Sequence, residues 1–247
     1  MVTTQRKFRF EFGSMTAPFF FRSFDVVQDQ SAHKVGTDSV LLGAWTKTNA
    51  STILDIGTGT GLLALMMAQN HPDATIDAIE PEPNAFFEAS NNFHRAPFAG
   101  RLTIENVSLQ EFRSKIKFDL IISNPPYHAG QVVPKNNERL NARHAVSLPI
   151  PELYRCAANL LGENGIISFI FPFEDEGKHL QHAASKGLFP CKILRTVRSD
   201  GKFERTLIQA GFTSCCPSEE QLLVKDNQNR YSSEYISLTQ EFYSKSL

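Results

Sequence analysis

A strand, a glycine-rich turn and a helix follow one another at residues 53–68, and this unit limits the possible folds more than any other part of the chain. The strand is apolar and contains Asp55, and the turn holds three glycines at Gly57, Gly59 and Gly61. Glycine allows the backbone to turn tightly and to approach a ligand closely. An apolar helical pattern follows directly. The unit therefore predicts a strand–loop–helix element with a ligand site at the loop.

The same alternation of strand and helix patterns continues through most of the chain. We expect strands at about 51–56, 75–80, 101–107, 118–123 and 165–171, and helices at about 61–70, 83–95, 150–161 and 173–186. Such alternation predicts an α/β fold, a mostly parallel sheet with helices on both faces.

Later segments change character. Residues 188–197 and 205–212 predict an antiparallel hairpin around Asp200-Gly201. We expect a further edge strand at 222–224 and an amphipathic helix at 232–243.

The glycine loop differs from a dinucleotide loop in two ways. Its spacing is Gly-x-Gly-x-Gly, and Asp55 stands two positions before the first glycine, where it would repel a pyrophosphate. A cationic, zwitterionic ligand fits better, with Asp55 facing the ammonium end of a methionine moiety. Glu80, which closes the next strand, suits a ribose diol because a carboxylate accepts from both hydroxyls. Taken alone, Glu80 fits a solvated charge at a strand end better than a ligand contact.

The strand at 118–123 ends in the sequence Asn124-Pro125-Pro126-Tyr127. Two consecutive prolines stiffen this turn and remove its N–H donors. The Asn124 amide oxygen and the Pro125 carbonyl can accept hydrogen bonds from an exocyclic amino group, and Tyr127 can stack on the ring that carries it. An isolated turn of this sequence also fits a simple strand end with Tyr127 in the core. Together with the upstream motifs, it indicates methyl transfer to a conjugated amine.

Composition excludes several classes of protein. The chain has 247 residues with a formal net charge of −1, so any affinity for nucleic acid must come from local patches. Its four cysteines lack Cys-x-x-Cys spacing, which predicts a reduced, cytoplasmic protein without a structural metal. We find no run of 18 apolar residues and no signal peptide, so no membrane association is expected.

Basic residues cluster in two places. The long segment 128–146 carries Arg139 and Arg143, and the predicted hairpin carries Arg198 and Lys202. Both clusters also fit ordinary solvated faces. Because the first begins directly after Tyr127, we expect a lid over the substrate and a basic rim that binds RNA phosphates.

The joint order and spacing of these motifs is that of a class I S-adenosylmethionine-dependent amino-methyltransferase. The chain resembles the bacterial tRNA1(Val) adenine-N6 methyltransferases over nearly its whole length. The resemblance includes Lys34-Val35-Gly36-Thr37-Asp38, the glycine loop, the Asn124–Tyr127 turn and the tail segments Tyr231-Ser232 and Leu238-Thr239-Gln240.

The resemblance implies a Rossmann-like methyltransferase fold, S-adenosyl-L-methionine as cofactor and adenosine 37 of a valine tRNA as substrate. It also implies cofactor contacts from Lys34, Thr37 and Asp38. Members of the family carry an acid after the third strand that contacts the cofactor's adenine amino group. The matching position here is Ser108, a departure that leaves a hydroxyl in place of a carboxylate.

Residues 1–50 are expected to form an N-terminal extension that packs on the cofactor site, and 51–247 a single methyltransferase domain, acting as a monomer. The extension contains a predicted strand at 8–12 and a helix over 40–45, with Asp38 as its N-cap. Three alternative functions stay open: guanine-N2 methylation of ribosomal RNA, glutamine-N5 methylation of release factors, and RNA binding without catalysis by a protein that binds the cofactor.

Overall fold

The computed structural model describes residues 17–29, 34–125 and 148–244. The predicted strand at 8–12 therefore lies outside the described residues, as do Pro126, Tyr127, Arg139 and Arg143.

The elements follow the predicted alternation closely. The strands are β1 (Phe19–Phe20), β2 (Asp25–Val26), β3 (Thr52–Ile56), β4 (Thr75–Ile79), β5 (Leu102–Glu105), β6 (Phe118–Ser123), β7 (Leu161–Pro172), β8 (Phe189–Val197), β9 (Phe203–Gly211) and β10 (Ser218–Leu223). The helices are α1 (Thr37–Trp45), α2 (Leu62–Asn70), α3 (Pro83–Arg95), α4 (Ile150–Leu160), α5 (Glu176–Ser185) and α6 (Ser233–Thr239), with 3-10 turns η1 (Ala99–Arg101) and η3 (Phe173–Asp175).

Eight of these strands form one sheet in the order β10-β8-β9-β7-β6-β3-β4-β5. Within this sheet only β9 runs opposite to the others, because it pairs antiparallel with both β7 and β8. The fold prediction is confirmed: a mostly parallel sheet with an antiparallel hairpin near the C-terminus.

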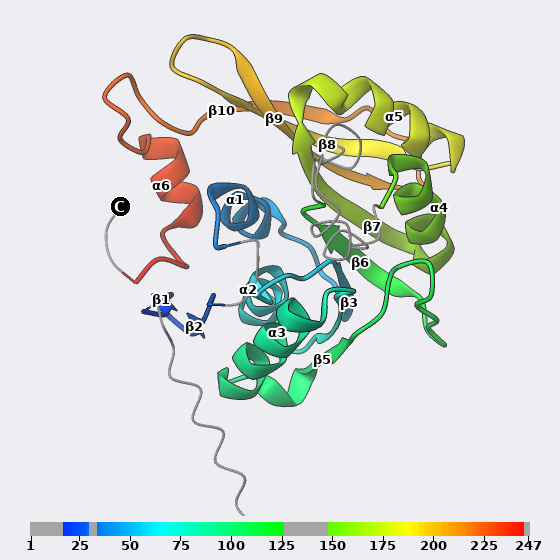
Figure 1. The fold of residues 1–247 in the computed structure, drawn as a ribbon. Helices are drawn as coiled ribbons and strands as arrows, with labels where there is room; N and C mark the ends of the chain where they lie inside the picture. Colours follow the sequence, from blue (N-terminus) through cyan, green and yellow to red (C-terminus); the bar gives the residue numbers. More distant parts are fainter. Residues whose placement is uncertain (1–16, 30–33, 126–147, 245–247) are drawn as a thin grey trace, which may run out of the picture.

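Helices cover both faces of the sheet (Figure 1). The core on one face is built from α1, α2, α6 and the inner side of α3, and the core on the other face from α4 and α5. Strands β3 and β6 are apolar along almost their whole length because both of their faces are covered.

Strand order reverses between β3 and β6. The chain moves outward from β3 through β4 to β5, then returns to β6 on the other side of β3 and continues to β7. At such a reversal the two following loops diverge, and ligands of open α/β sheets bind beyond the carboxyl ends of the strands at this point. The glycine loop follows β3 and the Asn124 turn follows β6, so both lie at the reversal.

Several predicted boundaries were wrong. Gly36, not Asp38, is the N-cap of α1, because the helix begins at Thr37. The strand expected at 222–224 begins earlier, at Ser218, in a polar stretch without a strand-like pattern. The helix expected over 173–186 is split into η3 and α5.

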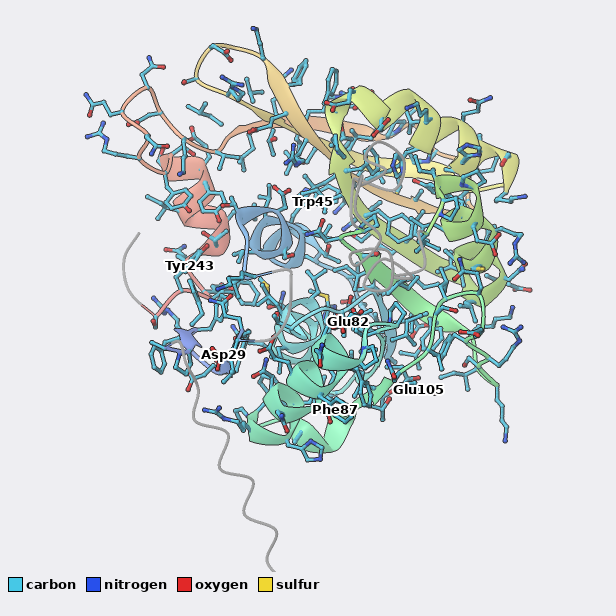
Figure 2. The ribbon with its side chains drawn as sticks, viewed as in Figure 1. Asp29, Trp45, Glu82, Phe87, Glu105 and Tyr243 are labelled. Carbon is cyan, nitrogen blue, oxygen red and sulfur yellow. The ribbon has the colours of Figure 1, made fainter. Side chains whose placement is uncertain are left out.

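The C-terminal helix is also shorter than predicted. It ends at Thr239, because the chain then turns back to pair with the N-terminal segment. Phe21 and Tyr243 form an antiparallel bridge, and the Arg22 amide donates to the Phe242 carbonyl at 2.8 Å. Figure 2 shows Tyr243 close to β1 and β2.

Candidate active site

The glycine loop adopts the conformation that its sequence predicts. Gly57, Gly59 and Gly61 all have positive φ, of 67°, 58° and 86°. L side chains rarely adopt this region, so the three positions require glycine. A Cβ added at Gly57 or Gly59 would meet no atom within 4 Å, which shows open space beside the loop. That space is where a ligand can approach the backbone closely.

Asp55 lies fully buried beneath this loop. Its Oδ2 accepts hydrogen bonds from the Thr58 hydroxyl at 2.5 Å and from the Ala64 amide at 3.0 Å. Its Oδ1 is buried without a hydrogen-bond partner among the described residues. Burial raises the pKa of Asp55 to about 7, against the opposing effect of those two hydrogen bonds and with a smaller contribution from the charge of Glu80. A cationic hydrogen-bond donor would pair with Oδ1 and would also stabilise the ionised form of the buried Asp55 carboxylate.

Glu80 lies at the end of β4, with its carboxylate turned toward the glycine loop. Its Oε2 accepts from the Gly59 amide at 2.8 Å and its Oε1 from the Glu82 amide at 3.0 Å. Glu82 in turn caps α3 by accepting from the amides of Asn84 and Ala85. These contacts fix the Glu80 carboxylate beside Gly59, where a carboxylate can also take up hydroxyl donors of a bound ribose.

Asn124 lies at the carboxyl end of β6, next to β3. Its Nδ2 donates to the Ser39 hydroxyl on α1 at 2.8 Å. The preceding Ser123 hydroxyl donates to the Ile56 carbonyl of β3 at 2.8 Å, which ties the two strand ends together. The glycine loop and the Asn124 turn are therefore held as neighbours. Pro125 follows at the limit of the described residues.

Of the residues expected from the extension, Asp38 contacts the strands at the same edge of the sheet. Lys34 is exposed just before α1, and Thr37 and Asp38 form the first turn of that helix. The Asp38 carboxylate accepts from the Arg205 guanidinium of β9 at 2.8 Å. This ion pair joins α1 to the hairpin of β8 and β9.

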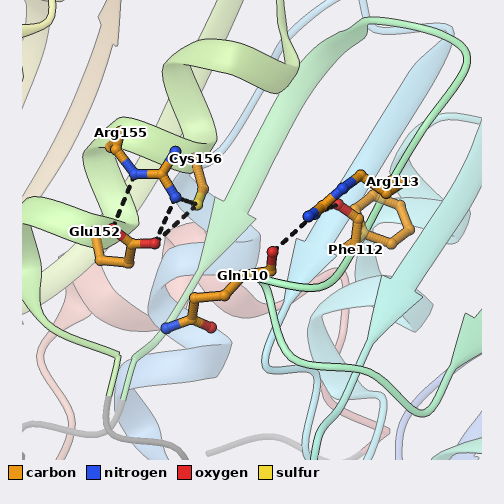
Figure 3. A network of polar contacts seen from close by, with 6 residues as sticks. All are labelled: Gln110, Phe112, Arg113, Glu152, Arg155 and Cys156. Carbon is orange, nitrogen blue, oxygen red and sulfur yellow. Dashed lines mark hydrogen bonds and ion pairs between the residues drawn. The ribbon is translucent and has the colours of Figure 1, made fainter.

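Ser108 is buried in the loop after β5, where its hydroxyl donates to Glu111 Oε2 at 2.6 Å. That hydrogen bond is the main reason why the pKa of Glu111 lies below its usual value. A carboxylate is thus present beside position 108, although it comes from Glu111. Figure 3 shows how the same loop is stiffened: Arg113 donates to the carbonyls of Gln110 and Phe112, beside a second cluster of Glu152, Arg155 and Cys156 on α4.

Arg198 and Lys202 flank the turn of the hairpin, and both side chains are largely exposed. They share the Asp200 carboxylate, at 3.4 Å from Arg198 and 4.0 Å from Lys202. Because the end of β7 lies beyond the end of β6 and pairs with the start of β9, the hairpin turn projects at the same edge as Asn124.

The described residues form neither a metal site nor a membrane-spanning helix. No group of three or more His, Cys, Asp or Glu residues there could hold a metal ion. Every helix in this part of the chain is too short or too polar to cross a lipid bilayer.

The sheet order, the positive-φ glycine loop and the carboxylates of Asp55 in β3 and Glu80 after β4 define a class I methyltransferase. Residues 30–147 match the family model of the methyltransferase small domain. Among solved structures, the fold is similar to a predicted O-methyltransferase from Agrobacterium tumefaciens, with a TM-score of 0.63, 16% identity and 83% of this chain and 96% of that chain covered. It is also similar to TYW2 of P. horikoshii in complex with MeSAdo, with a TM-score of 0.58, 15% identity and 81% and 73% covered.

Curated relatives narrow the class to one family. A protein named tRNA1(Val) (adenine(37)-N6)-methyltransferase from Bacteroides fragilis is 41% identical over 240 residues, covering 94% of this chain and all of the relative. The protein of the same name from Christiangramia forsetii is 40% identical over 235 residues, covering 92% and 98%. The chain belongs to the tRNA1(Val) (adenine(37)-N6)-methyltransferase family, is an enzyme and uses S-adenosyl-L-methionine.

The residues present fit that cofactor. The orphan Asp55 oxygen suits an ammonium donor, the open backbone at Gly57 and Gly59 leaves room for close approach, and the Glu80 carboxylate suits a ribose. Two further residues that the sequence did not point to also form hydrogen bonds here. Ser39 accepts from Asn124, and Asn92 donates to the Thr60 carbonyl of the glycine loop. A single Ser or Asn inside a helical pattern carries no signal that distinguishes it from a surface residue.

Proposed function

We propose that this enzyme methylates the exocyclic N6 of adenosine 37 in the anticodon loop of a valine tRNA. Family membership at about 40% identity over nearly the whole chain supports this substrate. The observation that carries the proposal is the position of Asn124 at the end of β6. This strand pairs directly with β3, which leads into the glycine loop. A nucleotide of an anticodon loop is already unpaired, so placing its base at Asn124 costs less than extruding a base from a duplex.

The chain's own residues orient the acceptor. The Asn124 amide oxygen and the Pro125 carbonyl accept the two amino hydrogens, which aims the nitrogen lone pair. We assign Pro126 and Tyr127 to the walls that flank the base, with the Tyr127 ring stacked on it. The bound cofactor supplies an electrophilic methyl group on a sulfonium. Positioning of this kind contributes as much as about 7–11 kcal/mol in well-aligned systems. The amino proton leaves to solvent after transfer.

We assign cofactor contacts to Lys34, Thr37, Asp38, Asp55, Gly57, Gly59, Gly61, Glu80, Ser108 and Asn124. Phosphate contacts are assigned to Arg139, Arg143, Arg198 and Lys202. We further propose that the enzyme acts as a monomer in the cytoplasm. The hydrogen bond between Ser39 and Asn124 supports the proposal that the N-terminal extension packs on this site.

The test offers the enzyme a choice of acceptors. Labelled cofactor is incubated with total tRNA, ribosomal RNA and a release factor, and the labelled products are digested and identified by mass spectrometry. We expect N6-methyladenosine from tRNA alone. N2-methylguanosine from ribosomal RNA, or N5-methylglutamine from the release factor, would replace the proposed substrate. Binding of both the cofactor and tRNA without any transfer would indicate an RNA-binding protein without catalytic activity.

A further inference from the structure

Asn92, on the inner face of α3, binds backbone groups from two distant parts of the chain. Its Nδ2 donates to the Thr60 carbonyl at 2.8 Å and to the Val27 carbonyl at 2.9 Å. Its Oδ1 accepts from the Val27 amide at 2.9 Å. The side chain is 1% exposed, so these three hydrogen bonds form away from water. A buried carboxamide with this set of partners is expensive to replace, because each lost bond leaves a desolvated polar group.

The Thr60 carbonyl belongs to the glycine loop. On one side of it the Gly59 amide donates to Glu80, and on the other Gly61 packs against α3 so closely that a Cβ there would lie 2.5 Å from Phe93 Cε1. Asn92 therefore holds the middle of the loop, between an anchor on β4 and a contact with its own neighbour Phe93. The orientation of the Gly59–Thr60 backbone depends on these contacts together.

Val27 belongs to the N-terminal segment that leads to α1. The same segment is held one helical turn earlier on α3, where the Asp29 amide donates to Glu88 at 2.5 Å. Gln28 accepts from the Val35 amide at 2.8 Å, directly before α1. α1 then reaches Asn124 through Ser39. A continuous set of contacts thus runs from the glycine loop through Asn92 and the extension to the catalytic turn.

We infer that Asn92 is a positioning residue for the cofactor: its carboxamide couples the glycine loop to the N-terminal segment, so that both adopt their cofactor-binding conformation together. The inference rests on the proposed cofactor site and adds to it a residue that touches no reacting atom. Asn92 acts through the backbone of Thr60 and Val27, and the ligand whose affinity depends on this contact is an adenosyl cofactor.

The test substitutes Asn92→Asp. This change keeps the shape and the acceptor for the Val27 amide, but it turns a second acceptor toward two carbonyls. Asn91→Asp is the matched control, because it makes the same chemical change on an exposed neighbour of the same helix. Calorimetry with S-adenosylhomocysteine should show a Kd raised about tenfold or more for Asn92→Asp, as expected when buried hydrogen bonds are lost. Asn91→Asp should stay within about twofold of the wild type.

Thermal melts separate this role from a purely structural one. A structural residue would lower Tm and leave Kd unchanged in protein that is folded at the assay temperature. A folded Asn92→Asp enzyme with the wild-type Kd would therefore overturn the inference. If the wild-type enzyme binds the cofactor but does not methylate tRNA, the proposed substrate is refuted and the inference about Asn92 is unaffected.

A measurement on the wild-type enzyme decides the question if Asn92→Asp does not fold. Amide hydrogen exchange is followed with and without S-adenosylhomocysteine. We expect the ligand to slow exchange at Gly59 and at Val27 together, because Asn92 joins the two segments. Protection of the glycine loop without any change at Val27 would contradict the coupling.

Discussion

Asp55 supports the glycine loop through one carboxylate oxygen, while its other oxygen is buried without a hydrogen-bond partner among the described residues. In the protein without cofactor, burial raises the pKa of this residue, so its protonated form persists to higher pH than in an exposed Asp. An unfolded Asp titrates near its ordinary value of 3.8, whereas the folded group has a pKa of about 7. Between these values the folded state binds more protons than the unfolded state.

We predict that Asp55 makes the cofactor-free enzyme less stable as pH rises from about 4 to about 7. Urea unfolding at several pH values measures this slope, and Asp55→Asn should remove it. Asp119, which also accepts backbone amides but is exposed, gives a matched control as Asp119→Asn. Equal slopes for the wild type and Asp55→Asn would show that the buried carboxyl does not titrate in this range.

Gly61 is the glycine with the tightest surroundings in the cofactor loop. Its φ of 86° is unfavourable for an L side chain, and a Cβ at this position would lie only 2.5 Å from Phe93 Cε1. We predict that Gly61→Ala lowers the free energy of unfolding by about 1–3 kcal/mol, the usual cost of a strained left-handed residue. Gly100→Ala is the control, because a Cβ there meets no atom within 4 Å and φ is not positive. A loss of the same size in both variants would argue against strain at Gly61.

At the scale of single residues, sequence spacing predicted the positions where the local backbone conformation requires a particular residue type. The three glycines could be recognised because only glycine fits a repeated positive φ. Asp55 was singled out because it stands two positions before the first glycine, and Glu80 because it follows the end of a strand. Asp38 was placed wrongly as an N-cap, since extended backbone at Gly36 starts the helix earlier. Asn92 could not be found, because its partners Thr60 and Val27 are far away in the sequence.

At the scale of elements, the hairpin of β8 and β9 extends the proposed RNA-binding surface. Its turn is fixed by the Arg198 amide donating to the Lys202 carbonyl at 2.8 Å and by positive φ at Gly201. Arg198 and Lys202 therefore project from a rigid turn, and the ion pair between Asp38 and Arg205 fixes its base against α1. Because the turn is already ordered, binding phosphate restricts the two side chains but does not have to order the backbone that carries them.

We predict that Arg198→Gln and Lys202→Gln each weaken tRNA binding and reduce the slope of log K against log salt by about 0.7–0.9. Lys115→Gln is the control, because Lys115 is exposed before the amino end of β6, at the opposite edge of the sheet. Fluorescence titrations over a range of salt concentrations measure the slopes. Unchanged slopes for both hairpin variants would remove the hairpin from the RNA-binding surface.

Elements with a strong pattern were predicted within a few residues, and weakly patterned ones were not. The helices α2 and α3 and the strands β3, β4 and β6 alternate regularly between apolar runs and turns. Most of β10 is exposed and polar, so only its pairing with β8 makes it a strand. The end of α6 is likewise set by a distant contact, the bridge between Phe21 and Tyr243.

At the scale of the whole molecule, the reversal of strand order brings the site together. Alternating patterns predict a parallel sheet, but they do not give the order of its strands, because the order depends on crossover connections. In the structure β6 lies against β3, which places Asn124 beside the glycine loop although the two are more than sixty residues apart. Methyl transfer between two ligands requires this proximity.

The most direct test of the central claim is identification of the nucleoside at position 37 of a valine tRNA transcript after reaction. The wild-type enzyme should form N6-methyladenosine at that position, and a transcript with guanosine 37 should stay unmodified. Asn124→Ala should yield no product even at saturating cofactor, whereas the exposed Asn164→Ala should match the wild type. Methylation at another nucleotide, or full activity in Asn124→Ala, would contradict the assignment.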